Sequence, residues 1–377
     1  MKIKSIKSIK NLKNKTVLVR CDFDVPLKKE TRDKRQETRI TDDSRLRAAV
    51  PTIKYLLAKG AKVVLMGHLG RPGGKFVKEM SLSPVKNRLE KLLGEKIGFI
   101  SGEIPSLATL ARNDGQLIML ENLRFNPGEE KNDAKFAKKL ASLGDIYINE
   151  AFAVSHRSAA SVDAIKKFLP SYAGLNLEQE ILHLSAVLSK PQKPLVAIVG
   201  GAKIETKLPV IKQFMKTADY ILVGGGVAND FLKVRGIDIK KSLVDEKYLR
   251  EAKKILKNQK KIIIPVDWKE KDERILDIGP KTIKVYSEII KKAKTIVWNG
   301  PMGYFEDKKF AVGTERIARA ILNSKSLAVI GGGETGEAIE KMKNEKLKMK
   351  NKFISTGGGA MLEYLGGKKL PGLNKII

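Results

Sequence analysis

The chain has 377 residues, of which 42% are hydrophobic, 31% charged and only 6% aromatic, and its formal net charge is +31. This length and apolar content allow two domains with sizeable cores, and no apolar run approaches the roughly 20 residues of a transmembrane helix. The single Cys21 excludes a disulfide within the chain and fits a reducing compartment.

Short β-branched runs alternate with helical patterns along the whole chain, which predicts parallel α/β layers. In the first half we expect strands at 15–20, 61–66, 116–120 and 145–149 and helices at 43–59 and 134–143. Cationic residues follow these strands: Arg20, then His68 and Arg71, then Arg124, then His156 and Arg157. Cys21 directly follows the first strand, so we expect it to be a small buried hydrophobic residue.

A connector separates the two halves. Residues 177–188 have a helical pattern and are bracketed by Pro170, Pro191 and Pro194, which is typical of a boundary between domains. We therefore predict an N-terminal domain over 1–172, a connector helix at 173–190 and a C-terminal domain over 191–361. The final residues, 362–377, are apolar enough to dock on the N-terminal domain.

In the second half we expect strands within 195–199, 220–223, 261–268, 295–299, 327–330 and 353–356. Glycines follow most of them, at 200–201, 224–226, 300, 331–333 and 357–359. Open parallel sheets bind ligands outside the carboxyl ends of their strands. The first half is therefore predicted to hold a small, multiply anionic ligand among Arg and His side chains. The second half is predicted to hold a phosphate chain against backbone N–H groups at helix starts.

Several motifs in the second half fit phosphate binding. Lys203 and Lys207 lie four residues apart, so on a helix they would share one face near an anion; the alternative is an ordinary lysine-rich helix. Glu334 beside its glycine turn suits Mg²⁺, or else a helix N-terminus. Asn299 and Glu306 could grip a ribose or phosphate, or simply form a turn.

One G-x-G-x-x-G pattern, at Gly331, Gly333 and Gly336, suggests a dinucleotide-binding fold. The acidic residue expected about 20 residues later at the end of the next strand is missing, which argues against a nicotinamide-dependent enzyme. A Walker A motif is also missing from the sequence.

Taken together, these segments resemble phosphoglycerate kinases along nearly the whole chain. The matching motifs occur in the family's order: DFDVP (22–26), TDDSRLRAAVPTI (41–53), HLGRP (68–72), ENLRF (121–125), GGAK (200–203), GGGVANDFL (224–232), WNGPMGYFE (298–306), GGGET (331–335) and STGGGA (355–360). The resemblance implies two Rossmann-like, doubly wound parallel-sheet domains joined by a helix, with a cleft between them. It also implies phosphoryl transfer from 1,3-bisphosphoglycerate to ADP, directly in line after closure of the domains.

The resemblance also assigns site residues. The phosphoglycerate site would comprise Asp22, Asp24, Arg45, His68, Arg71, Arg124 and Arg157. The nucleotide site would comprise Gly201, Lys207, Gly225, Leu276, Asn299, Pro301, Glu306, Gly332, Gly333, Glu334 and Thr335. Arg45, Lys203, Gly358 and Gly359 would stabilise the transferring phosphoryl group, and Glu334 would hold Mg²⁺.

The sequence departs from the family's usual pattern at several positions. Asp24 stands where asparagine is usual, Glu150 and Glu334 each stand where aspartate is commoner, Thr206 takes an aspartate's place, and Ala159 replaces a second histidine. The loop at 28–39 is long for the family, and the stretch after 265–268 is short.

Two rival functions follow from single features, and a catalytically inert relative is a third. The net charge favours a nucleic-acid-binding protein, but that class requires clustered basic residues with interleaved aromatics. The glycine pattern favours an NAD-dependent enzyme. We expect a cytoplasmic monomer with ADP/ATP and phosphoglycerates as substrates, and without specific nucleic-acid or membrane partners.

Overall fold

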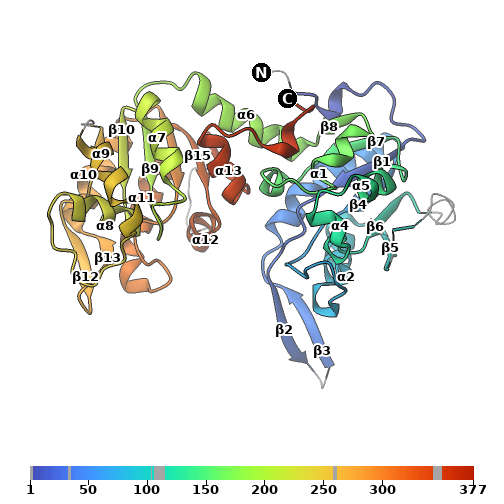
Figure 1. Ribbon diagram of the computed structural model, residues 1–377, viewed down its shortest axis with the longest axis horizontal. Helices are drawn as coiled ribbons and strands as arrows, with labels where there is room; N and C mark the ends of the chain where they lie inside the picture. Colours follow the sequence, from blue (N-terminus) through green and yellow to red (C-terminus); the bar gives the residue numbers. More distant parts are fainter. Residues whose placement is uncertain (1–2, 33–34, 103, 106–114, 258–260, 343–349) are drawn as a thin grey trace. The chain divides into compact units, whose positions relative to one another are not determined.

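A computed structural model describes residues 3–32, 35–102, 104–105, 115–257, 261–342 and 350–377 (Figure 1). The chain forms two compact units. Unit 1 comprises Met1–Ile181 with Lys369–Ile377, and unit 2 comprises Leu182–Lys368. Residues 369–377 thus belong to unit 1, whereas 362–368 belong to unit 2. In the part of the chain that is described, none of the helices is long and apolar enough to cross a membrane.

Unit 1 contains a parallel sheet in the order β5-β6-β4-β1-β7-β8. Its strands are β1 (Thr16–Arg20), β4 (Lys62–Met66), β5 (Gly98–Ile100), β6 (Leu117–Leu120), β7 (Ile146–Asn149) and β8 (Ser171–Ala173). Its helices are α1 (Ser44–Ala58), α2 (Ser83–Leu93), α4 (Pro127–Glu130) and α5 (Ala134–Ala141). The helix α6 (Leu175–Ser189) continues from unit 1 into unit 2.

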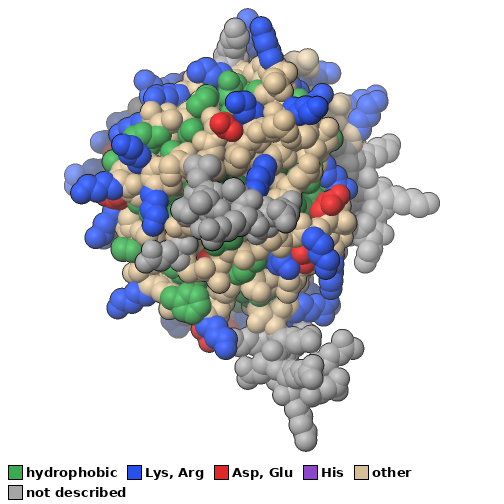
Figure 2. Space-filling view, turned by 90° about the vertical axis from the view of Figure 1, so that its right-hand side faces the viewer, with side chains coloured by type: hydrophobic (Ala, Val, Ile, Leu, Met, Phe, Trp, Pro, Cys, Tyr) green, Lys and Arg blue, Asp and Glu red, His purple; other side chains and the backbone are tan. Residues whose placement is uncertain are grey.

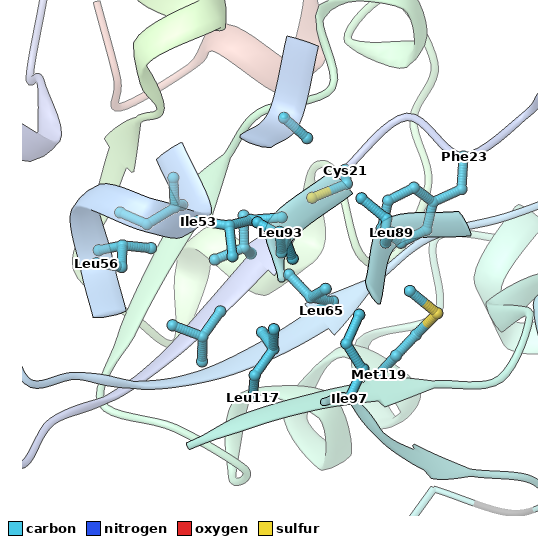
Figure 3. Packing of buried hydrophobic residues seen from close by; sticks show 14 of the residues in the cluster. Cys21, Phe23, Ile53, Leu56, Leu65, Leu89, Leu93, Ile97, Leu117 and Met119 are labelled. Atoms are coloured by element: carbon cyan, nitrogen blue, oxygen red, sulfur yellow. The ribbon is translucent and has the colours of Figure 1, made fainter. Parts of the chain in front are cut away.

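Alternate side chains of β1 enter two separate cores. Val17 and Val19 belong to the core that contains α1 and α2, whereas Leu18 lies in the core that contains α5. Both faces of the sheet are therefore covered, which explains why the strand is a continuous apolar run. Cys21 is fully buried in the first core, which also contains Phe23 (Figure 3), as predicted.

Unit 2 contains a second parallel sheet, in the order β11-β10-β9-β14-β15-β16. Its strands are β9 (Leu195–Val199), β10 (Tyr220–Val223), β11 (Ile262–Ile263), β14 (Thr295–Asn299), β15 (Leu327–Gly331) and β16 (Lys352–Ser355). Its helices are α7 (Leu208–Thr217), α8 (Gly225–Val234), α9 (Leu249–Lys257), α10 (Pro280–Lys292), α11 (Val312–Asn323), α12 (Gly333–Lys341) and α13 (Gly358–Leu365). Two parallel sheets with helices confirm the predicted fold class.

Two antiparallel hairpins correct the sequence-based expectations. The segment 28–39 is expected to be a loop, but it forms most of β2 (Leu27–Arg32) and β3 (Arg35–Ile40). These two strands pair antiparallel, with Leu27 opposite Ile40 at one end and Arg32 opposite Arg35 at the other. The strand expected within 261–268 is present but short, as β11 (Ile262–Ile263). It ends before Pro265, which lacks the N–H that a ladder needs, and a new strand, β12 (Trp268–Lys271), then pairs antiparallel with β13 (Arg274–Ile278).

Basic side chains are spread over the surface. Figure 2 shows Lys and Arg scattered across one face, with Asp and Glu among them, and they do not gather in one patch on that face. This distribution is typical of solvated charges. On the face shown, the net charge of +31 is therefore not concentrated in one basic patch.

Candidate functional site

The strand ends of unit 1 bring cations together around His68. This residue follows β4 and is 1% exposed. Its pKa is lowered well below the usual histidine value, first by burial and then by the positive charges of Arg20, Arg124, Arg157 and Arg45. Arg124 follows β6, Arg157 follows β7, and Arg45 lies in the first turn of α1. Four separate chain segments therefore contribute guanidinium groups to one strand-end region.

Two carboxylates interrupt this basic cluster. Asp22 is 8% exposed and pairs with Arg45 at 3.0 Å. Burial raises the pKa of Asp22, and the charge of Arg45 opposes that rise. Asp24 accepts a hydrogen bond from the N–H of Gly70 at 2.9 Å. An asparagine amide oxygen could accept the same bond, so this contact is compatible with aspartate in place of asparagine.

Arg124 is held before any ligand arrives. It is 5% exposed, its Nη1 donates to the carbonyl of Gly70 at 2.7 Å, and its Nε lies 3.3 Å from Oε1 of Glu130. Burial lowers its pKa from the ordinary arginine value. Arg71, by contrast, is exposed in the loop after β4. The guanidinium of Arg124 is thus pre-oriented for a bidentate contact with a carboxylate or phosphate.

The resemblance leaves one member of this region, Arg20, without a role. The sequence marks Arg20 only as a cation at a strand end, yet it is 1% exposed and its Nη2 lies 3.0 Å from Nδ1 of His68. Its position as the last residue of β1, in line with the cations after the other strands, was the available signal.

In unit 2 the loops after β9 and β14 approach closely. A Cβ on Gly300 would lie 2.2 Å from the carbonyl oxygen of Gly200, so only glycine fits there. Gly332, after β15, has φ +105, which a larger residue rarely adopts. These backbone turns leave room for an anion beside N–H groups at the starts of α8 and α12.

Most of the predicted nucleotide residues meet at one cavity of about 170 Å³. Its lining includes Gly201, Gly225, Leu276, Pro301, Glu306 and Glu334. The exposed side chains of Leu243 and Tyr304, which we did not predict, also line it. Apolar side chains beside glycine turns and carboxylates suit an apolar base, a ribose and a phosphate chain.

Three other predicted residues, Lys207, Asn299 and Thr335, form hydrogen bonds with one another or with the glycine turns. Lys207 donates to Oδ1 of Asn299, whose Nδ2 donates to the carbonyl of Gly331 at 2.9 Å. The N–H of Gly300 donates to Oγ1 of Thr335 at 2.8 Å. Burial lowers the pKa of Lys207 to about 8, and the charge of Glu334 opposes that shift.

The expectation that Lys203 and Lys207 share a helix face is wrong. Helix α7 begins only at Leu208, with Lys207 as its N-cap, and Lys203 is exposed in the preceding turn. Pro209 explains the late start, because proline is favoured in the first turn of a helix and cannot donate in its interior. Gly358 and Gly359 begin α13, separated by two residues from the end of β16.

Unit 1 has a basic region at its strand ends, and unit 2 has a glycine-lined cavity at its strand ends. Together with the fold, these two regions suit a kinase, in which an anionic acceptor and a nucleotide are positioned without a general base. A family model described as phosphoglycerate kinase matches residues 6–368. A phosphoglycerate kinase of Moorella thermoacetica is 44% identical over 386 residues, covering 96% of this chain and 95% of the relative, and one of Herpetosiphon aurantiacus is 43% identical over 385 residues, covering 95% of each.

Solved structures agree. Phosphoglycerate kinase from Coxiella burnetii is 36% identical with a TM-score of 0.84, covering 100% of this chain and 99% of that one. The enzyme from Pyrococcus horikoshii is 32% identical with a TM-score of 0.85, covering 99% and 98%. The chain belongs to the phosphoglycerate kinase family and is a phosphotransferase. The family uses ADP and ATP as substrates and acts on phosphoglycerates.

Proposed function

We propose that this protein binds phosphoglycerate in unit 1 and the nucleotide in unit 2, and transfers a phosphoryl group directly from 1,3-bisphosphoglycerate to ADP, and in reverse from ATP to 3-phosphoglycerate. The observation that carries this proposal is the contrast between the two strand-end regions. One gathers four arginines around His68, and the other surrounds a cavity with glycine turns. The first arrangement suits a compact polyanion, and the second suits a nucleotide.

Catalysis requires positioning and neutralisation of charge. The acceptor oxygen of 3-phosphoglycerate or ADP is already ionised at neutral pH, so a general base is unnecessary. We assign Arg45, Lys203 and the N–H groups of Gly358 and Gly359 to the transferring phosphoryl group. The two bound substrates must also be brought together, and we assign that motion to a hinge at α6.

Mg²⁺ is assigned to Glu334, together with phosphate oxygens of the nucleotide. Glu334 lines the cavity, and a carboxylate oxygen is a ligand that Mg²⁺ prefers. Among the described residues no group of three or more His, Cys, Asp and Glu side chains could hold a metal. One carboxylate plus substrate phosphates is the usual arrangement for Mg²⁺ in such enzymes. The ion would neutralise charge on the phosphates.

Further assignments concern the setting of the reaction. We propose that the protein acts in the cytoplasm as a monomer. The single, fully buried Cys21 fits a reducing compartment such as the cytoplasm.

The test is a coupled assay with ATP, Mg²⁺ and 3-phosphoglycerate. Arg45→Ala should lower kcat by about 10²-fold or more, as loss of one transition-state donor does. Arg47→Ala is the matched control, because this exposed residue lies on the same helix and pairs with Asp43 instead; its turnover should stay near the wild-type value. Absent turnover in the wild type, or nicotinamide binding instead, would reject the proposal.

A further inference from the structure

Arg20 is a buried cation with three different acceptors. Its Nε donates to Oγ of Ser161 at 2.8 Å, its Nη1 donates to the carbonyl of Cys21, and its Nη2 lies 3.0 Å from Nδ1 of His68. Among the described residues, no carboxylate forms an ion pair with it. Its link to an acid runs through Ser161, whose Oγ donates to Oε1 of the buried Glu129 at 2.6 Å. The guanidinium is therefore fixed from several sides.

This contact determines where the proton of His68 resides. An arginine side chain has only donors, so Nδ1 of His68 must accept and cannot carry a hydrogen. The proton of the neutral imidazole is then on Nε2. A protonated imidazole would place an N–H of His68 against an N–H of Arg20, and burial beside this cation already opposes protonation.

The other charged groups around His68 agree. Arg124, Arg157 and Arg45 add positive charge and further lower its pKa. The one described acid in ion-pair range is Asp24, with Oδ2 3.8 Å from Nε2 of His68 and a side chain 42% exposed. The Nε2–H therefore faces the accessible rim of the basic region, while Nδ1 faces the interior.

We propose that Arg20 is a positioning residue that holds His68 as the Nε2–H tautomer, so that His68 presents a permanent neutral donor to an anionic oxygen of phosphoglycerate. The identity of the ligand in this inference rests on the proposed function. The tautomer of His68 follows from contacts within the protein and does not depend on that function. A fixed donor binds an anion without taking up a proton, so this contact does not depend on protonation of His68 as pH changes. The surrounding arginines supply the positive charge, and His68 supplies a hydrogen-bond donor with a fixed orientation.

The experiment is ¹⁵N NMR of the imidazole rings in the ligand-free wild type. The chain has three histidines, so His156→Gln and His183→Gln suffice to assign the signals. We expect Nε2 of His68 to be protonated, Nδ1 to be unprotonated, and the ring to stay neutral from about pH 8 to pH 5.5, below the ordinary histidine pKa of about 6.5.

Arg20→Met removes the donors and the charge while keeping an apolar stem. His68 should then populate both tautomers and titrate closer to the ordinary histidine range. Ser161→Ala is the matched control, because it removes another partner of Arg20 but leaves the bond to His68; its tautomer should remain that of the wild type. The KM for 3-phosphoglycerate at pH 7.5 should rise about tenfold in Arg20→Met, as for the loss of one bond to a charged group, while the KM for ATP stays within about twofold.

The outcomes separate the two proposals. A protonated Nδ1 in the wild type, or an unchanged tautomer and titration in Arg20→Met, overturns the role of Arg20. If Arg20→Met does not fold, the ¹⁵N NMR measurement of the His68 tautomer in the wild type is the remaining test of the proposal. If the tautomer is as expected but the wild type does not turn over phosphoglycerate, the proposed function fails while the control of His68 by Arg20 stands.

Discussion

Glu150 gives a pH-dependent prediction at the start of the connector helix. This residue follows β7 and is 3% exposed. Its Oε1 accepts from Oγ1 of Thr52 at 2.7 Å and from the N–H of Asn176 at 3.0 Å, and its Oε2 accepts from the N–H of Leu177 at 3.3 Å. The carboxyl group thus caps the first turn of α6. Burial raises its pKa from 4.5 to about 8, against the effect of these hydrogen bonds.

The raised pKa fixes the sign of the effect. Between about pH 4.5 and pH 8 the folded chain keeps the proton of Glu150 and the unfolded chain has lost it, so the free energy of unfolding falls as pH rises through this window. A shift of about 3.5 units corresponds to at most roughly 5 kcal/mol, at about 1.4 kcal/mol per unit. Above about pH 8 both states are ionised, and the contribution becomes constant.

Glu150→Gln removes this titration, because an amide stays neutral. The assay is urea unfolding followed by far-UV circular dichroism at pH 5, 6.5 and 8.5, for wild type and variant. The wild type should lose stability relative to the variant by a few kcal/mol between pH 5 and pH 8.5. A difference in unfolding free energy that stays constant with pH would refute the assignment of a buried, protonated carboxyl group.

Three further predictions concern catalysis and the nucleotide cavity. Lys203→Ala should lower kcat by on the order of 10²-fold or more with less change in nucleotide affinity; near-normal turnover removes this residue from the mechanism. Glu334→Ala should raise the Mg²⁺ concentration required for activity and leave 3-phosphoglycerate binding intact, and an unchanged Mg²⁺ titration contradicts its role as a ligand. Burial raises the pKa of Asp230 to about 6, and this residue accepts from the N–H of Asp245 at 2.8 Å; Leu243, two residues before Asp245 in the chain, lines the cavity. Asp230→Asn should therefore stabilise unit 2 more at pH 8 than at pH 5, and the same stability increment at both values argues against burial of an ionised Asp230.

The sequence predicted the longer parallel strands because each of them is a continuous apolar run with a polar or glycine residue at or just after its carboxyl end. The helix predicted at 43–59 appears as α1, flanked by Asp43 and Lys59 as its caps. Such features are local, and they survive folding because both faces of each sheet are buried.

The sequence-based predictions failed where contacts between residues far apart in the chain determine the structure. The strand β8 has three residues and forms by pairing with β7, so no local pattern marks it. The role of Arg20 depends on contacts with Ser161 and His68, which are 141 and 48 residues away in the sequence. A strand-end cation is visible in the sequence, but whether it faces a ligand or the interior is settled only by tertiary packing.

The most direct test of the division between the two units is calorimetry of Arg124→Lys with each ligand alone. Lysine cannot reproduce the bidentate contact, so 3-phosphoglycerate binding should weaken by about 1.5–3 kcal/mol and this loss should persist at high salt. ADP binding should hardly change, because its assigned site lies in the other unit. An equal loss of ADP affinity, or a difference that salt abolishes, would contradict the account and leave Arg124 as part of a diffuse basic surface.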